Sequence, residues 1–81
     1  MFNVKWLYMR NNAYDLIAKI IGDTAYVLTQ TEDFPAEDND IPCFMQDVME
    51  QDYSDEWNLY PAEEVLNDGN EVLWEKDLEV V

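Results

Sequence analysis

Residues 40–50, DIPCFMQDVME, contain the clearest helical pattern of the chain. Asp40 is a typical N-cap residue, and Pro42 falls in the first turn, where its missing N–H does no harm. Asp47 and Glu50 lie between the apolar positions and are expected to face solvent. The segment predicts an amphipathic helix that packs on a sheet, because large apolar residues recur three and four positions apart. These residues are Ile41, Phe44, Met45, Val48 and Met49.

The residues before this helix predict three antiparallel strands. Residues 2–9 alternate between two faces and are rich in aromatic and β-branched side chains, as is typical of a strand. Residues 14–21 fit either a helical stripe or a strand. We favour a strand, because the segment is short and has turn residues on both sides, as in a hairpin. A Gly22–Asp23 turn then leads into a strand over residues 25–29.

The residues around and after the helix are more acidic. Residues 31–39, TEDFPAEDN, predict a surface loop. Pro61, the acids after it and Gly69 indicate a helix of about two turns over residues 61–68. Residues 71–74 alternate like a strand, and residues 74–81 either add a sheet edge or stay loose.

The predicted fold class is therefore α+β. A small antiparallel sheet, made of an N-terminal three-stranded meander and a further C-terminal strand left open, is packed by one or two short helices. Residues 1–81 form a single domain, in which residues 1–30 are a near-neutral sheet. Residues 31–81 supply the acidic loop, the helices and the C-terminal strand.

Acidic residues are concentrated after Gln30. The chain has 19 Asp and Glu against four Lys and Arg, for a formal net charge of −15. A disordered acidic tail would lack large apolar residues, since it buries too little surface to offset the entropy of ordering. Here aromatic and branched apolar residues are interleaved with the acids throughout residues 31–81. The pattern favours a folded acidic surface.

Most catalytic and metal chemistry is excluded by residue type. The chain has no histidine, so neither a Ser–His nor a Cys–His pair exists, and its two glycines cannot form a phosphate-binding loop. A calcium loop starting at Asp38 would place Pro42 and Cys43 at its fifth and sixth positions, where an oxygen ligand and a glycine belong. We predict no enzyme activity, no metal site and no cofactor, and leave weak divalent-cation binding open. Cys43 is expected to be a buried small apolar residue.

The compartment expected from the sequence is a reducing cytosol. The single cysteine cannot form an internal disulfide, and no signal peptide is recognised. No apolar run approaches the ~20 residues of a membrane span. The negative charge also disfavours direct binding to nucleic acid and to anionic lipid.

In size, charge density and the mixture of acids with aromatics across residues 31–81, the chain resembles the small acidic DNA-mimic inhibitors of phages and mobile elements. Proteins of this class act against restriction enzymes, CRISPR nucleases and other host DNA-binding proteins. The resemblance implies an inhibitor that occupies the DNA or RNA channel of a basic host enzyme, in the host cytoplasm if phage-encoded. These inhibitors share no fold, so no site residue is carried over from them.

The partner-binding surface is predicted from the acids of the loop and helices and from the aromatics among them. A carboxylate surface can occupy a Lys/Arg groove built for phosphates, and tyrosine and tryptophan are frequent interface anchors. Tyr60 belongs to the same aromatic segment. The predicted residues are Glu37, Asp38, Asp40, Asp47, Glu50, Asp52, Tyr53, Asp55, Glu56, Trp57, Glu63 and Glu64.

Two other functions fit the same pattern. One is an immunity or antitoxin protein that neutralises a cognate basic toxin. The other is an acid-rich assembly module whose charge serves solubility. The sequence also leaves a homodimer open.

Overall fold

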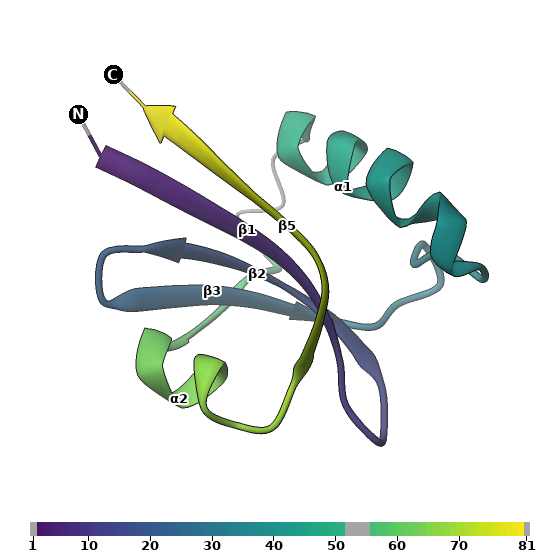
Figure 1. Ribbon diagram of the computed structural model, residues 1–81, viewed down its shortest axis with the longest axis horizontal. Coiled ribbons are helices and arrows are strands. Elements are labelled where there is room, and N and C mark those ends of the chain that lie inside the picture. The colour runs from purple at the N-terminus through teal and green to yellow at the C-terminus, as the bar shows by residue number, and fades with distance from the viewer. Residues whose placement is uncertain (1, 52–55, 81) are drawn as a thin grey trace.

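Strand β1 (Phe2–Arg10) is apolar on both faces, and this double pattern shapes the fold. Trp6 and Tyr8 are buried on one face, and Leu7 and Met9 on the other. Because successive side chains of a strand point to opposite faces, β1 needs cover on both sides. The computed structural model, which describes residues 2–51 and 56–80, provides it by placing a helix on each face of one sheet (Figure 1).

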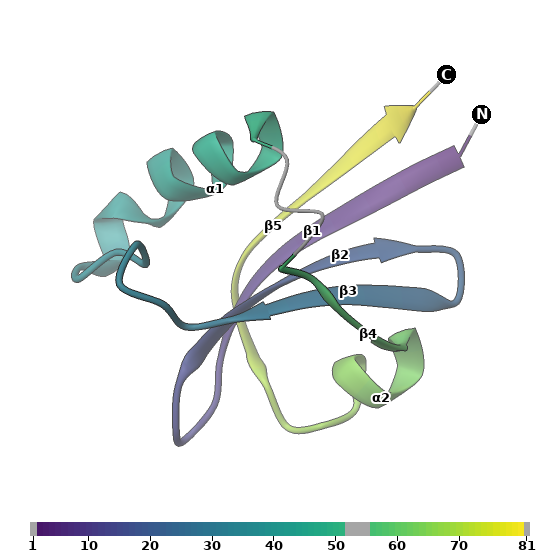
Figure 2. The ribbon, with the colours of Figure 1, turned by 180° about the vertical axis from the view of Figure 1, so that it is seen from behind.

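The sheet is antiparallel, with strand order β4-β3-β2-β1-β5. Its other strands are β2 (Asp15–Ile21), β3 (Thr24–Thr29), β4 (Asn58–Pro61) and β5 (Glu71–Val80). The N-terminal meander is confirmed, including a strand rather than a helix in the ambiguous segment. Gly22 occupies the β2–β3 turn with φ of 60°, a conformation that suits glycine. The C-terminal segment forms a sheet edge along β1, which leaves the two chain ends side by side (Figure 2).

Helix α1 (Ile41–Glu50) covers one face of the sheet. Ile41, Met45 and Val48 are buried against Trp6 and Tyr8, and the predicted stripe is confirmed. A short 3-10 helix, η1 (Asp38–Asp40), leads into α1. Asp40 does stand at the N-cap position, although its side chain makes no capping hydrogen bond.

Helix α2 (Ala62–Leu66) covers the opposite face and is shorter than predicted. Pro61 was assigned to the helix but pairs with Thr24 as the last residue of β4, a strand that the sequence pattern did not reveal. The Ala62 N–H donates to the Asp23 carbonyl oxygen over 2.8 Å, which fixes the start of α2 beside the β2–β3 turn. Strand pairing therefore takes Pro61, the first residue of the predicted helix.

The burial of two side chains adds to or corrects the sequence analysis. The predicted surface loop contains Phe34, which is buried with its ring centroid 5.0 Å from that of Phe44. Cys43, predicted to be buried, is exposed. It lies two residues after Ile41, and at ~100° per residue this places it on the outer side of α1. Neither α1 nor α2, the α-helices of the described part of the chain, is long and apolar enough to cross a membrane.

Candidate partner-binding site

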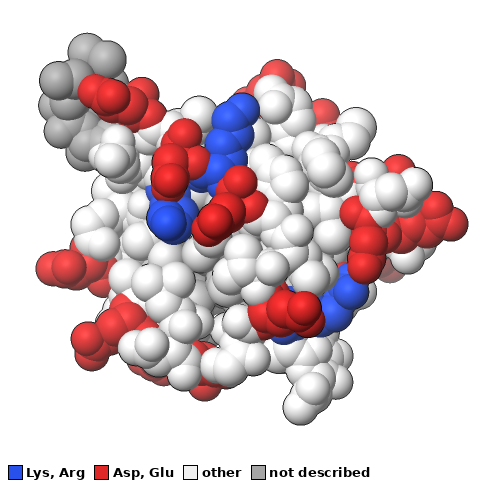
Figure 3. Space-filling model, in the orientation of Figure 1, with Lys and Arg blue, Asp and Glu red and all other residues white. Residues whose placement is uncertain are grey.

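Acidic side chains form the outer surface of the fold. Apart from Asp15, each acidic residue that the structure describes is exposed. On the face drawn in Figure 3, acids lie around the margin and beside the few basic side chains, rather than in one continuous stripe. The charge is thus distributed over several elements.

Part of the predicted site lies on the α1 side of the sheet. Asp47 and Glu50 are exposed on α1, and a shallow depression joins Asp47 to Asp33 of the preceding loop. Glu56 lines a neighbouring hollow of about 90 Å³, together with Phe34 and Phe44. We define the α1-side acidic surface as Glu37, Asp38, Asp40, Asp47, Glu50 and Glu56.

Asp38 differs from the rest of this surface because it has an internal partner. The Arg10 guanidinium donates to Asp38 Oδ1 from Nη2 over 2.8 Å and to Asp38 Oδ2 from Nη1 over 3.3 Å. The same guanidinium donates to Asp15 from Nε over 2.7 Å and from Nη2 over 3.1 Å. Arg10 thereby ties the β1–β2 hairpin to η1, which leads into α1, and part of the Asp38 charge is neutralised within the molecule.

Asp15 is the buried member of this network. The Tyr8 hydroxyl donates to its Oδ2 over 2.5 Å, and its backbone N–H donates to the Gln30 side chain over 3.0 Å. The pKa of Asp15 is lowered chiefly because Arg10 hydrogen-bonds the charged form, an effect that burial opposes and Tyr8 reinforces. Arg10 lowers the pKa of Asp38 in the same way. Burial, with the bond to Asp15, raises the pKa of Tyr8.

Trp57, predicted to be an interface anchor, makes internal ring contacts. Its ring centroid lies 6.2 Å from that of Trp6 in an edge-to-face arrangement. The Lys19 ammonium lies 5.3 Å from the Trp57 ring, 5.6 Å from Trp6 and 5.2 Å from Tyr26. These three rings surround a cation on the α1 side of the sheet, and such contacts are stabilising. Trp57 is a member of the predicted partner-binding set, and in the structure it packs on the α1 side of the sheet.

Other predicted residues lie elsewhere. Glu63 and Glu64 are on α2, on the opposite side of the sheet from α1 (Figure 1). Asp52, Tyr53 and Asp55 fall outside the described residues. The described members of the predicted set therefore belong to two surfaces, one on each side of the sheet.

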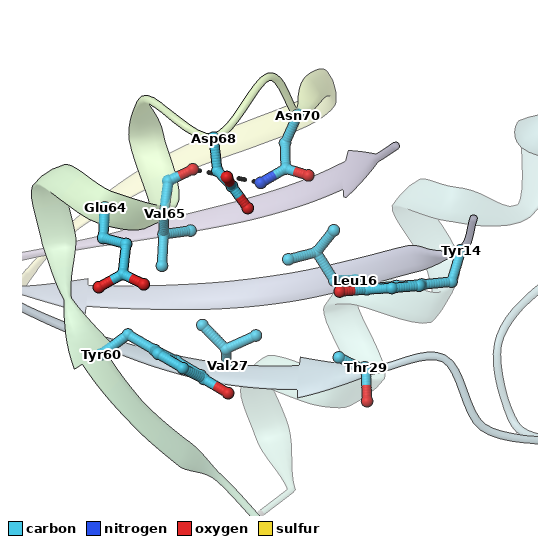
Figure 4. A pocket seen from close by; sticks show the side chains of 9 residues that line it. All are labelled: Tyr14, Leu16, Val27, Thr29, Tyr60, Glu64, Val65, Asp68 and Asn70. Atoms are coloured by element: carbon cyan, nitrogen blue, oxygen red, sulfur yellow. Dashed lines mark hydrogen bonds between the residues drawn. The ribbon is translucent and has the colours of Figure 1, made fainter. Parts of the chain in front are cut away.

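The α2 side contains a hollow of about 140 Å³ that the sequence did not reveal (Figure 4). The residues that line it come from or adjoin β2, β3, β4, α2 and the turn after α2. Strands β2 and β3 are distant in the chain from the other segments, so no local spacing of residues could predict the hollow. Glu64 was among the predicted site residues, whereas Asp68 and Tyr14 were not. The lining residues are Tyr14, Leu16, Val27, Thr29, Tyr60, Glu64, Val65, Asp68 and Asn70.

A row of acids on β5 was also missed. Glu75 and Asp77 are two residues apart and therefore on one face of the strand, the face of their cross-strand partners Leu7 and Lys5. The Lys5 ammonium lies 4.0 Å from Glu75 and 3.8 Å from Asp77. The alternation would have indicated this row had the segment been assigned to a strand. Charges on a sheet edge oppose pairing with another edge, so two copies of β5 would repel each other.

Comparison of the chain with protein-family models, with curated proteins and with solved structures finds no match. Inference about its function therefore rests on its own residues. The strongest features are the exposed acids on both sides of the sheet and the mixed acidic and aromatic hollow beside α2.

Proposed function

We propose that this protein binds a basic nucleic-acid-binding protein of a host cytoplasm and inhibits it by occupying its DNA or RNA channel. The observation that supports this proposal is the exposure of every described carboxylate except that of Asp15, on a folded chain of net charge −15. A groove lined with Lys and Arg gains affinity for DNA by neutralising phosphates. Fixed carboxylates offer the same groove a complementary charge.

The rigidity of the acid-bearing elements favours mimicry. Asp47 and Glu50 are three residues apart on α1, where such positions are ~5–6 Å apart at Cβ. Buried Met45 and Val48 hold that helix on the sheet, so the carboxylates are presented with little ordering cost. A restriction or CRISPR nuclease is the kind of partner that this surface fits.

The first test is salt-dependent capture followed by competition. Partner proteins retained from a lysate at ~50 mM salt are expected to bind at least ~10-fold more weakly at ~200 mM, because screening weakens charge pairing. Asp47→Asn with Glu50→Gln should weaken binding by about as much, whereas Asp23→Asn with Glu63→Gln removes the same charge away from α1 and should have a smaller effect. A captured partner that still binds its nucleic acid with unchanged affinity would contradict mimicry.

The α2 side favours a second function, the neutralisation of a cognate basic toxin. Exposed Tyr14, Tyr60 and Leu66 accompany acids there, and interfaces between proteins combine aromatic cores with polar rims. Co-expression with such a toxin should restore growth, even where the toxin's nucleic-acid site stays free in the complex. A toxin that binds this protein and remains fully active would rule this function out.

A further inference from the structure

The short helix α2 leaves its side of the sheet partly uncovered. Only Ala62 and Val65 of α2 are buried, whereas the ten-residue α1 buries three residues. The register places Tyr60 opposite Ala25 and Val72 opposite Met9, which puts both on the α2 side. Of the large apolar side chains exposed within residues 3–51 and 56–79, most therefore gather on this side. They are Tyr14 at 42%, Tyr60 at 44%, Leu66 at 51% and Val72 at 45% exposed.

The hollow beside α2 has the size of one long side chain. Its volume of about 140 Å³ is well below the ~300 Å³ or more of typical small-molecule sites. It still exceeds the space of several water molecules at ~30 Å³ each. Leu16 and Val27 of the sheet form an apolar floor, and Val65 of α2 forms one wall. The size favours a single protruding group of another protein over a cofactor.

Carboxylates and tyrosines surround this floor. Figure 4 shows the Glu64 and Asp68 carboxylates on the α2 side of the hollow, the hydroxyl end of Tyr14 directed toward its middle, and Tyr60 on the β4 side. Within the described residues, neither carboxylate has a hydrogen-bond or ion-pair partner. Asn70, by contrast, already has a partner within the protein, because its side-chain amide donates a hydrogen bond to the Val65 carbonyl oxygen over 3.2 Å. The two charged groups of the hollow, Glu64 and Asp68, are thus both anionic and lack an ion-pair partner among the described residues.

We infer that this hollow binds one arginine side chain of the basic partner protein. A guanidinium forms paired hydrogen bonds with carboxylates, here Glu64 and Asp68, and stacks on aromatic rings, here Tyr14 and Tyr60. Its methylene stem would lie on the apolar floor. Lysine is a poorer fit, because its ammonium is compact, strongly hydrated and unable to stack. This inference rests on the proposed function, since it names the contact that the basic partner makes.

Two capped peptides, Gly-Gly-Arg-Gly-Gly and the same peptide with lysine in place of arginine, test the inference directly. We expect the arginine peptide to shift the amide NMR signals of the hollow residues, and the lysine peptide to bind several-fold more weakly. Glu64→Gln with Asp68→Asn should lower affinity for the arginine peptide at least ~10-fold, because both carboxylates that would hold the guanidinium lose their charge. The matched control, Glu71→Gln with Glu79→Gln, removes the same charge at two exposed positions outside the hollow and should lower affinity less than ~2-fold.

Tyr60→Ala should weaken binding of the arginine peptide without any change of charge. Equal losses in the two charge variants, equal binding of the two peptides, or signal shifts spread evenly over the acidic surface would each overturn the inference. Those outcomes leave the proposed function standing if the captured partner still competes with nucleic acid. Arginine binding in the hollow, combined with a partner whose nucleic-acid affinity is unchanged, would instead refute mimicry alone.

Discussion

Met45→Ala is expected to lower the free energy of unfolding by about 3 kcal/mol, which is typical of a buried methionine replaced by alanine. Met45 is fully buried between α1 and the sheet, where it belongs to the cluster that contains Trp6 and Tyr8. Removing its side chain leaves a cavity that the rigid sheet face cannot fill. Urea unfolding followed by tryptophan fluorescence measures the change.

Cys43→Ala, on the same helix, is the matched control. Cys43 is exposed, so its replacement should change the free energy of unfolding by less than about 0.5 kcal/mol. The Cys43 thiol of the wild-type protein should also react with a thiol reagent before unfolding. Similar losses in both variants, or a thiol that is protected in the folded state, would mean that α1 is rotated from the position described.

Asp15→Asn is expected to lower the free energy of unfolding by about 2 to 3 kcal/mol at neutral pH, because charge-assisted hydrogen bonds are lost from a buried site. The two bonds from Arg10 and the one from Tyr8 all end on the Asp15 carboxylate. Asparagine keeps the size of the side chain and removes its charge. Asp38→Asn is the control, and should be milder because Asp38 is largely exposed.

The difference between wild type and Asp15→Asn should depend on pH. The pKa of Asp15 is lowered in the folded state, so its charge stabilises the fold above the ordinary aspartate pKa of about 4, and this contribution is lost as pH falls through the lower folded value. The two unfolding curves should therefore converge in acid. Relief of the general repulsion among the other acids affects both proteins alike and largely cancels. A difference that stays constant from pH 7 to pH ~2 would contradict the assigned network.

The pattern of apolar residues predicted most of the sheet and the principal helix. In α1 the spacing of Met45 and Val48 is local, so one segment contained all the information needed. The length of α2 was not predictable in this way, because Pro61 is a good first helical residue but pairs with Thr24, which is distant in sequence. Cys43 was misassigned although the helical periodicity alone places it on the outer side of α1.

The candidate site, like the fold, could be predicted only in part from the sequence. Composition alone establishes that the protein has a dense negative charge, no histidine and no means of Ser–His or Cys–His catalysis. Which acids act together depends on the tertiary structure. Glu64 and Tyr14 are far apart in the chain. They share one hollow only because α2 packs on the sheet against side chains of β2.

Residue type and local period are thus properties of the sequence itself, and they determined the acidic character, the α+β class and the position of α1. Tertiary structure decided the rest, because strand pairing joins distant segments in registers that no local pattern encodes. It separated the predicted acids onto two sides of the sheet and directed Arg10 to Asp15 and Asp38. It also left beside the short helix α2 an open hollow lined by carboxylates and tyrosines.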